Sequence, residues 1–465
     1  MSYYIVLWTI TVRKGKKIMA VMIQRPKGTN DTLPSEVRKW HTVEKITDDI
    51  ASQYGFKEIR VPTFEDTGLF IRSVGETTDV VTKEMYTVTA SGDSQFTLRP
   101  EGTAGTMRAV IENGILNEGL PQKVYYRLSC FRHEKPQAGR LREFHQFGCE
   151  MVGSASPRAD AEVISLAKSV LDTCGLKNIV LNINSIGCKN CRPNYHKALK
   201  DYFYARKDEL CGTCQERLEK NPMRIIDCKS PVCQEIAKDA PVITDFLCEE
   251  CSEHFSKLQE YLSAMGIEFT LNPKIVRGLD YYTRTVFEFI STDIGAQGTV
   301  CGGGRYDGLL EELGAKPTPA LGFGMGLERL IMTMEKQGCD FMEDKKCDLY
   351  IAPMSEDTVS KAMELAASLR QEGYFVEYDL IGRGLKAQMK YADKAGASFV
   401  IVLGSDELEN GKANLKNMAT GEQSEISLGE SFVKEFSDLH LNNMFGSAEA
   451  DIEALLGGKK NERKM

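Results

Sequence analysis

The order of helical and strand-like segments changes once along the chain, and this change constrains the fold more than any other feature. Before residue 339, strand-like segments follow one another with helices that do not alternate regularly, as in the antiparallel sheet of an α+β domain. Over 346–436, short apolar segments alternate with two helical segments. This β-α-β-α-β order predicts a separate, small α/β domain with a mostly parallel sheet.

The composition excludes several classes of protein. With 42% hydrophobic residues, 40 glycines and 15 prolines, the chain is neither disordered nor fibrous. Its net charge of −8 means that contact with nucleic acid must come from local basic patches. No apolar run approaches the roughly 20 residues of a membrane span. Together with the lack of a targeting signal, this predicts a cytoplasmic protein.

The two ends of the chain are expected to lie outside the folded domains. The apolar run from Tyr3 to Ile10 is short, precedes its positive charges and fits a signal peptide poorly. Residues 1–22 are therefore either a short native extension or sequence upstream of a true start at Met19 or Met22. Residues 437–465 are expected to form a flexible tail.

Hydrophobic periodicity predicts the main elements of the larger domain. Helices are expected over 36–54 and 160–175, since apolar residues recur there at helical spacing. A polar loop, 133–141, joins strands 123–132 and 142–153 in a long hairpin. Other strands are expected over 56–64, 95–100, 178–187 and 268–290. A Gly-rich turn before a helix is expected over 298–314, and a strand or turn before a helix over 320–335.

Eight cysteines form four closely spaced pairs in a charged, mostly helical window, 188–255. Such pairs suit tetrahedral Zn²⁺ better than disulfides in a chain without a signal peptide. A helix from 194 to about 206 would be ~20 Å long and would separate the first two pairs too far for one metal. The alternative is reduced cysteines packed among short helices. One or two structural zinc ions are thus predicted, in the sets Cys188, Cys191, Cys248 and Cys251, and Cys211, Cys214, Cys228 and Cys233.

Arginines beside glycine-rich turns point to a polyphosphate site. Five of them occur in "RPEGTAG", "FRHE", "RGLDYYTRTVFE", "GGGRYDGL" and "GLERL", and Arg140 lies on the hairpin loop. Guanidinium forks bind phosphate oxygens bidentately, and glycine lets backbone amides approach. There is no P-loop motif, and any single arginine is more often a surface charge or part of a structural salt bridge. The set is Arg99, Arg132, Arg140, Arg277, Arg305 and Arg329.

Over about residues 24–430 these motifs resemble the bacterial histidyl-tRNA synthetase family, a class II aminoacyl-tRNA synthetase family. "FRHEKPQAGRLREFHQFGCE" is similar to class motif 2, "GFGMGLERL" to motif 3, and the segment ending at Pro62 to the dimer-forming motif 1. "RGLDYYTRTVFE" and "GGGRYDGL" are similar to the two histidine-specific signatures.

The resemblance implies an α+β architecture and a homodimer. Its catalytic domain would have a six- or seven-stranded antiparallel sheet, over 23–187 and 256–338. A helical Cys-rich insertion would span 188–255, and an α/β anticodon-binding domain would span 346–436. No membrane contact is implied.

The implied reaction is ATP-dependent ligation of L-histidine to tRNA(His) through a histidyl-adenylate, with Mg²⁺ accompanying ATP. By resemblance, Arg132 and Arg277 stabilise the α-phosphate, Arg140 and Arg329 hold the β- and γ-phosphates, and Glu134 reads adenine. Histidine needs acceptors for its ammonium group and partners for both ring nitrogens. These would come from Glu101, Thr103, Gln146, Glu150, Tyr282 and Tyr306, although the two tyrosines could be core residues and Glu150 could face solvent.

Two local basic clusters are candidates for tRNA contact. The motif 2 loop, with Gln137 and Arg142, would meet the acceptor end. "GRGLKAQMK", with Arg383 and Lys386, opens a helix of the C-terminal domain and is a candidate anticodon contact. Charge clusters of this kind are usually solvated faces.

Two other functions compete with the synthetase interpretation. One is a catalytically inactive, synthetase-like regulatory subunit of a histidine-biosynthetic phosphoribosyltransferase, which lacks the anticodon domain and usually loses the ATP arginines. The other is a zinc-bearing nucleic-acid module. The α/β segment and Arg132, Arg277 and Arg329 are all present and favour the enzyme.

Overall fold

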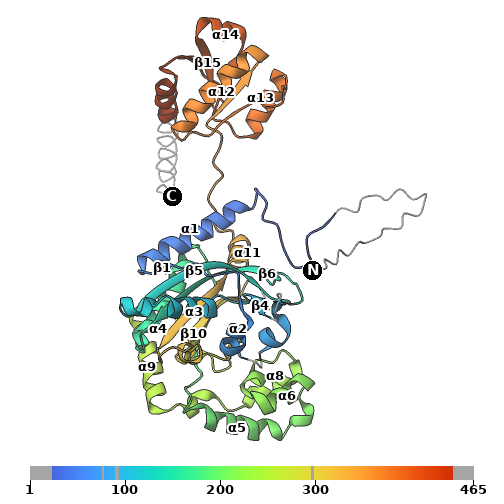
Figure 1. The fold of residues 1–465 in the computed structure, drawn as a ribbon, viewed down its shortest axis with the longest axis vertical. Helices are drawn as coiled ribbons and strands as arrows, with labels where there is room; N and C mark the ends of the chain where they lie inside the picture. Colours follow the sequence, from blue (N-terminus) through green and yellow to red (C-terminus); the bar gives the residue numbers. More distant parts are fainter. Residues whose placement is uncertain (1–22, 76–77, 90–93, 295–297, 444–465) are drawn as a thin grey trace, which may run out of the picture. The chain divides into compact units, whose positions relative to one another are not determined.

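The computed structural model describes residues 23–75, 78–89, 94–294 and 298–443 (Figure 1). The expectations for residues 1–22 and 444–465 lie outside these residues. The chain divides into two compact units at residues 342/343, and each is described by itself. Within the described residues no helix is both long and apolar enough to cross a membrane.

The first unit is built on an eight-stranded sheet in the order β1-β5-β6-β11-β10-β9-β7-β8. The six strands from β5 to β7 pair antiparallel. The short β1 and β8 add parallel pairs at the two edges, so the sheet is larger than the six or seven strands expected. The strands are β1 Lys57–Glu58, β5 Gln122–Phe131, β6 Glu143–Val152, β7 Ile179–Ser185, β8 Thr270–Leu271, β9 Thr283–Ser291, β10 Thr299–Arg305 and β11 Ala320–Gly326.

Four helices cover one face of this sheet and enclose the largest core. They are α1 Val37–Gln53, α4 Pro157–Thr173, α9 Glu249–Ala264 and α11 Leu327–Gln337. Along β6, Phe147, Cys149 and Met151 point into this core. Side chains alternate along a strand, so Gln146 and Glu150 face the other side of the sheet. That second face carries the candidate site.

The predicted long hairpin and the helices over 36–54 and 160–175 are confirmed by β5–β6, α1 and α4. Ser156 caps the N-terminus of α4, since its side chain accepts from the Arg158 N–H, and the first helical residue is Pro157. The strand expected over 56–64 is divided into β1 and β2. Beside the main sheet lie a three-stranded sheet and short helices, β2 Phe64–Asp66, α2 Thr67–Val74, η1 Val80–Glu84, β3 Tyr86–Thr89, β4 Gln95–Leu98, α3 Thr103–Glu112, η2 Ile115–Glu118 and α10 Leu309–Glu312.

The prediction of a Gly-rich turn over 298–314 is wrong, since residues 299–305 form the buried strand β10. Its glycines reflect close approach of neighbouring atoms rather than a turn. A Cβ on Gly303 would lie 2.2 Å from the Gly322 carbonyl oxygen, and one on Gly304 would lie 2.4 Å from that of Thr285. The strand expected over 268–290 is likewise interrupted, because residues 272–282 form a loop between β8 and β9.

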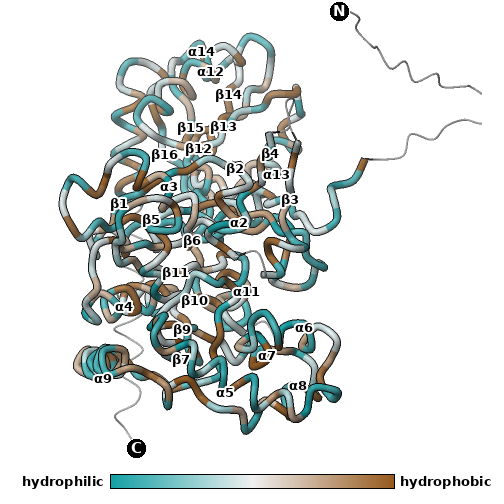
Figure 2. The backbone as a smooth tube through the Cα atoms, turned by 60° about the horizontal axis from the view of Figure 1, so that its bottom comes forward, coloured by the Kyte–Doolittle hydropathy of each residue, from teal (hydrophilic) through white to brown (hydrophobic). Residues whose placement is uncertain are grey.

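The cysteine window is helical, as predicted (Figures 1 and 2). Its buried side chains share one core with other residues of the first unit such as Tyr282 and Tyr306. In Figure 2 its helices mix hydrophilic and hydrophobic turns. The elements are α5 Arg192–Tyr204, η3 Lys207–Glu209, α6 Gly212–Lys220, α7 Met223–Ile226, α8 Pro231–Ile236, η4 Ala237–Asp239 and η5 Ile243–Phe246, followed by α9.

The second unit confirms the predicted β-α-β-α-β order and adds an antiparallel hairpin. Its sheet order is β13-β12-β14-β15-β16, with the first three strands parallel. The hairpin β15–β16 was missed because its segment is polar. The elements are β12 Leu349–Pro353, α12 Glu356–Gln371, β13 Val376–Tyr378, α13 Leu385–Lys394, β14 Phe399–Leu403, α14 Ser405–Asn410, β15 Lys412–Asn417 and β16 Gln423–Ser427.

A final helix over 432–443 extends beyond the boundary expected at residue 436. Phe432 and Phe436 lie in the core of the second unit, and Leu439 packs against it. The ring of His440 bonds to Asp348 at 3.1 Å. Residues 437–443 are therefore part of the folded unit rather than of a flexible tail.

Candidate active site and cysteine clusters

A cavity of 520 Å³ opens on the sheet face opposite the four covering helices. Its walls come from the β5–β6 hairpin, the N-terminus of α3, strands β9–β11, the start of α11 and the 272–282 loop. Sequence positions far apart in the chain thus meet at one site. The cavity contains nine of the residues predicted for ATP and histidine, namely Glu101, Thr103, Arg132, Glu134, Arg140, Gln146, Arg277, Tyr282 and Arg329.

Two arginines enter the cavity from the motif 2 hairpin. Arg132 follows β5, donates through Nε to the Pro100 carbonyl at 2.8 Å, and stacks over the Phe144 ring at 5.3 Å. Arg140 lies on the loop and pairs through Nε with Glu134 Oε2 at 2.7 Å. Arg132 is therefore held in place by groups outside the predicted site. Arg140 is instead paired with Glu134, the residue predicted to read adenine.

Arg329 on α11 completes a positive wall. It donates through Nε to the Gly139 carbonyl at 2.9 Å and through Nη1 to the Thr299 carbonyl at 2.8 Å. Burial, followed by repulsion from Arg140, lowers its pKa. Guanidinium groups nevertheless stay charged at neutral pH, so this wall is suited to an anion that relieves the repulsion.

Arg277 lies on the loop before β9, and 19% of its side chain is exposed. It forms an ion pair with Glu288 and stacks over the Tyr282 ring at 5.6 Å. Burial disfavours its charge, but Tyr282 and Glu288 outweigh that effect and raise its pKa. A Cβ on Gly302 would lie 2.6 Å from both terminal nitrogens of Arg277, so the observed position of this guanidinium requires glycine at residue 302.

Glu288 was missed from the sequence. A signal was present, because it is the one acid in the otherwise apolar strand segment "TVFEFI". Asp227 and Lys229 were also missed. They flank Cys228 in the insertion and line the same cavity, although nothing in their local sequence indicates this.

Two of the three residues predicted for the histidine ammonium group, Glu101 and Thr103, lie at the start of α3. Glu101 accepts from the Thr103 N–H at 2.7 Å and from the Ala104 N–H at 2.9 Å. Thr103 in turn donates its hydroxyl to Glu150 Oε1 at 2.7 Å. Gln146 accepts from the Cys130 thiol at 3.5 Å and faces the cavity from β6.

Glu150 lies behind the cavity wall rather than in it. It is fully buried, and it accepts from Tyr126 at 3.0 Å and from Tyr306. Burial raises the pKa of its carboxyl to about 8, although the bonding hydroxyls oppose this. Tyr306 is also fully buried and is not among the residues that line the cavity, whereas Tyr282 lines it and lies 6.3 Å from Tyr306, ring centre to ring centre.

Two of the candidate phosphate arginines are structural instead. Arg305 is fully buried and forks onto Asp160 at 2.6–3.0 Å. Arg99 donates to the carbonyls of Val61 and Pro62 at 2.8 and 2.9 Å. Both guanidinium groups are used within the protein, so the polyphosphate interpretation is wrong for them.

The residues predicted to contact tRNA lie outside the cavity lining. Gln137 is on the motif 2 loop, where its backbone bonds to Arg140, and Arg142 donates to the Glu134 carbonyl at 3.1 Å. In the second unit, Arg383 stacks over Tyr391 at 4.3 Å. Lys386 is exposed on α13.

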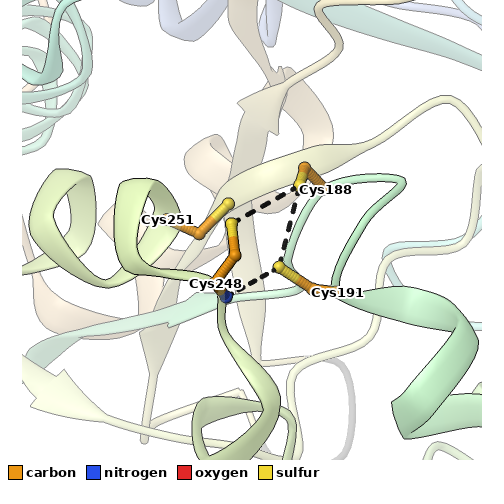
Figure 3. Close-up of side chains that lie close together, drawn as sticks. All are labelled: Cys188, Cys191, Cys248 and Cys251. Carbon is orange, nitrogen blue, oxygen red and sulfur yellow. Dashed lines mark hydrogen bonds between the residues drawn. The ribbon is translucent and has the colours of Figure 1, made fainter.

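The cysteines gather in two groups of four, the same grouping that was predicted. We call Cys188, Cys191, Cys248 and Cys251 cluster 1 (Figure 3), and Cys211, Cys214, Cys228 and Cys233 cluster 2. In each cluster all four Sγ atoms lie within 4.8 Å of one another. Helix α5 separates the two clusters along the chain, as its expected length implied.

The cluster geometry suits a tetrahedral metal. Sulfurs around zinc, with Zn–S near 2.3 Å, lie about 3.8 Å apart. The Cys188–Cys191, Cys188–Cys248 and Cys211–Cys228 Sγ pairs are separated by 3.7, 3.9 and 3.8 Å. Backbone N–H groups also donate to the sulfurs, as from Cys248 to Cys191 at 3.1 Å.

This antiparallel sheet, with guanidinium groups delivered by a strand–loop–strand hairpin and a strand–helix junction, defines a class II aminoacyl-tRNA synthetase. Residues 28–330 match the family model for histidyl-tRNA synthetase, and residues 348–438 match that for the anticodon binding domain. The chain belongs to the histidyl-tRNA synthetase family.

Individual proteins agree with this assignment. The chain is 55% identical over 408 residues to the histidine--tRNA ligase of Acetivibrio thermocellus, covering 88% of this chain and 98% of that one. It is 52% identical over 406 residues to that of Clostridium novyi, covering 87% and 97%. The crystal structure of apo S. aureus histidyl-tRNA synthetase aligns with a TM-score of 0.76 at 40% identity, covering 89% of this chain and all of that one.

Proposed function

We propose that the chain joins L-histidine to tRNA(His) in two steps. Histidine and ATP first form histidyl-adenylate and pyrophosphate, and the histidyl group then passes to the 3′ end of the tRNA with release of AMP. The main supporting observation is that Arg132 and Arg277 lie in the same cavity as Glu101, Thr103 and Gln146. Fixed cations for a phosphate thus stand beside acceptors for an amino acid.

In the first step, the histidine carboxylate attacks the α-phosphorus in line and the bond to pyrophosphate breaks. Charge builds on the phosphoryl oxygens, so catalysis rests on positioning and fixed positive charge. Arg132 is held by Pro100 and Phe144, and Arg277 by Glu288 and Tyr282. These two guanidinium groups stabilise the α-phosphate without having to reorient during the reaction.

ATP binding redistributes the charges at the motif 2 loop. The Arg140–Glu134 ion pair is half exposed on its arginine side, with 45% of that side chain accessible. Arg140 and Arg329 bind the β- and γ-phosphates. Arg140 then no longer pairs with Glu134, whose carboxylate accepts from the adenine amino group. Mg²⁺ arrives with ATP and neutralises part of its charge.

Histidine is recognised at both ends. Glu101, Thr103 and Gln146 accept from its ammonium group, and Tyr282 serves one ring nitrogen. Glu150 and Tyr306 lie behind the cavity wall, so Glu150 serves the other through Thr103, which lines the cavity and whose hydroxyl bonds to Glu150 Oε1 at 2.7 Å. A site that bonds both nitrogens rejects apolar isosteres by about 10⁴ or more, because their binding leaves buried polar groups unpaired.

Clusters 1 and 2 each hold one structural Zn²⁺. Four thiolates close the coordination shell and leave no position for a substrate, so the metal would supply folding energy rather than chemistry. Metal analysis of freshly reduced protein should find two zinc ions per chain. Protein without zinc that is folded and active would contradict this.

The acceptor end of the tRNA meets the motif 2 loop at Gln137 and Arg142, and the anticodon meets Arg383 and Lys386 on and before α13. The enzyme works as a cytoplasmic homodimer. Phe64, next to the motif 1 segment, is 57% exposed, as expected for an apolar residue that a second copy covers. Light scattering should give twice the chain mass, and Phe64→Asp should weaken the dimer.

Histidine-dependent exchange of labelled pyrophosphate into ATP tests this function. The regulatory-subunit alternative predicts no exchange, and Arg132, Arg140 and Arg329 in one cavity support exchange instead. Arg277→His should reduce exchange by orders of magnitude while tRNA binding survives. Equal loss of both would contradict the role of Arg277, and no exchange by wild-type protein would contradict the function.

A further inference from the structure

The segment that carries Tyr282 into the cavity has an unfavourable backbone conformation two residues later. Arg284 has φ of +51°, one of only two positive φ values among the described non-glycine residues. For a residue with a Cβ this left-handed conformation costs about 1 kcal/mol or more. Surrounding contacts must therefore hold it.

The first cysteine pair of cluster 1 bonds to the backbone of this segment. The Arg284 N–H donates to the carbonyl of Gly187 at 3.0 Å, directly before Cys188. Arg192, directly after Cys191, donates its guanidinium to the Tyr282 carbonyl. Both flanks of the Cys188–Cys191 pair thus bond to the backbone of residues 282–284.

The second cysteine pair of cluster 1 bonds to the side chain of Arg284. Glu250 lies between Cys248 and Cys251, and its Oε1 accepts from Arg284 Nη2 at 2.7 Å. His254, one turn further along α9, lies 3.5 Å from Arg284 Nη1. The N-terminal end of β9 and the residue before it are therefore bonded to residues that lie beside both cysteine pairs of cluster 1.

We propose that cluster 1 positions the histidine pocket, with Arg192 and Arg284 as positioning residues. Closing the cluster on one metal fixes the two cysteine pairs relative to each other, and their flanking residues then hold Tyr282 in the cavity. Metal in cluster 1 thereby supports affinity for histidine as well as folding. This inference rests on the proposed role of Tyr282 as a partner of the imidazole.

We expect the loss of this positioning to weaken the binding of histidine but not that of ATP. Arg192→Ala removes the bond to the Tyr282 carbonyl but no cysteine, so the zinc content should stay at the wild-type value. Misplacing a positioning group by about 1 Å can cost up to 10²-fold. We expect the KM for histidine in pyrophosphate exchange to rise about 10- to 100-fold, with the KM for ATP changed less than about twofold.

Three variants make the test specific. Arg192→Lys keeps a donor and should recover part of the histidine affinity. Arg206→Ala removes an arginine of the same insertion whose ion pair with Glu209 is solvent-exposed, and it should behave as wild type. Arg284→Asn tolerates the left-handed backbone but loses the bond to Glu250, and it serves if Arg192→Ala does not fold.

Calorimetry of histidine binding gives a readout independent of turnover. Chelation of zinc should weaken histidine binding, and added Zn²⁺ should restore it. The proposal is overturned if Arg192→Ala and Arg284→Asn keep both zinc and the wild-type KM for histidine, or if the KM for ATP rises equally. Lack of exchange in the wild-type protein would instead remove the proposed function.

Discussion

Gly302→Ala tests the role of Arg277 without touching Arg277 itself. The added Cβ would lie 2.6 Å from both terminal guanidinium nitrogens, while ordinary contacts begin at 3.4 Å. The guanidinium must therefore move by about 0.8 Å, the difference between these distances. Because Arg277 lines the cavity, it can shift into open space, and the strand itself need not move.

The displacement is large enough to measure. A 1 Å misplacement of a positioned catalytic group costs up to about 10²-fold in rate, which corresponds to about 2.7 kcal/mol of transition-state stabilisation. We therefore expect Gly302→Ala to lower kcat in histidine-dependent pyrophosphate exchange by about 10- to 100-fold. The Tm should change by only a few degrees, because the clash is with the end of a side chain.

Gly324→Ala is the matched control. Gly324 lines the same cavity from the neighbouring strand β11, but its Cβ would lie 3.5 Å from the nearest atom, on Gln146. This variant should keep its rate within about threefold of wild type. Equal rates for Gly302→Ala and wild-type protein, with the fold intact, would refute the placement of Arg277 at the reacting phosphate.

Two further predictions concern stability. Burial raises the pKa of Glu150 to about 8, above the ~4.3 of an unfolded chain. Between these pH values the folded state binds more protons, so the contribution of Glu150 to stability is present below about pH 4 and is lost as the pH rises through 8. The Tm of wild-type protein should thus fall more steeply from pH 5 to 8 than that of Glu150→Gln, and parallel curves would contradict the shift. Asp160→Asn should destabilise the fold by about 3 kcal/mol or more, because it removes the fully buried carboxylate onto which Arg305 forks and leaves Asp307, at 3.1 Å, as its remaining carboxylate partner. The exposed Lys45–Asp49 pair is the control, and Asp49→Asn should cost less than about 1 kcal/mol in denaturant unfolding.

Sequence periodicity predicted the elements whose burial is one-sided. Side chains of the β5–β6 hairpin alternate between core and cavity, and those of α1 alternate between core and solvent, so their spacing carries the information. Helix α4 is buried on most sides and was predicted as well. The expected length of a helix also excluded one grouping of the cysteine pairs, that of Cys188 and Cys191 with Cys211 and Cys214, but it left two other groupings possible. These features depend on geometry within a short stretch of chain.

What was missed depends on contacts between distant segments. Gly303 and Gly304 look like a turn, yet they lie in a strand because neighbouring backbones approach closely. Arg277 and Arg305 have similar Gly-rich settings, but one lines the cavity and the other pairs with Asp160 in the core. The local sequence does not indicate whether such an arginine will line the cavity or form an ion pair in the core.

Attachment of labelled histidine to a tRNA(His) transcript is the direct test of the proposed function. We expect ATP-dependent charging by the purified protein, with no charging when histidine is replaced by another amino acid. Arg277→His should lower the charging rate by at least about 10²-fold. Absence of charging by folded, zinc-loaded wild-type protein, or equal charging with a second amino acid, would show that the protein is not a histidine-specific ligase.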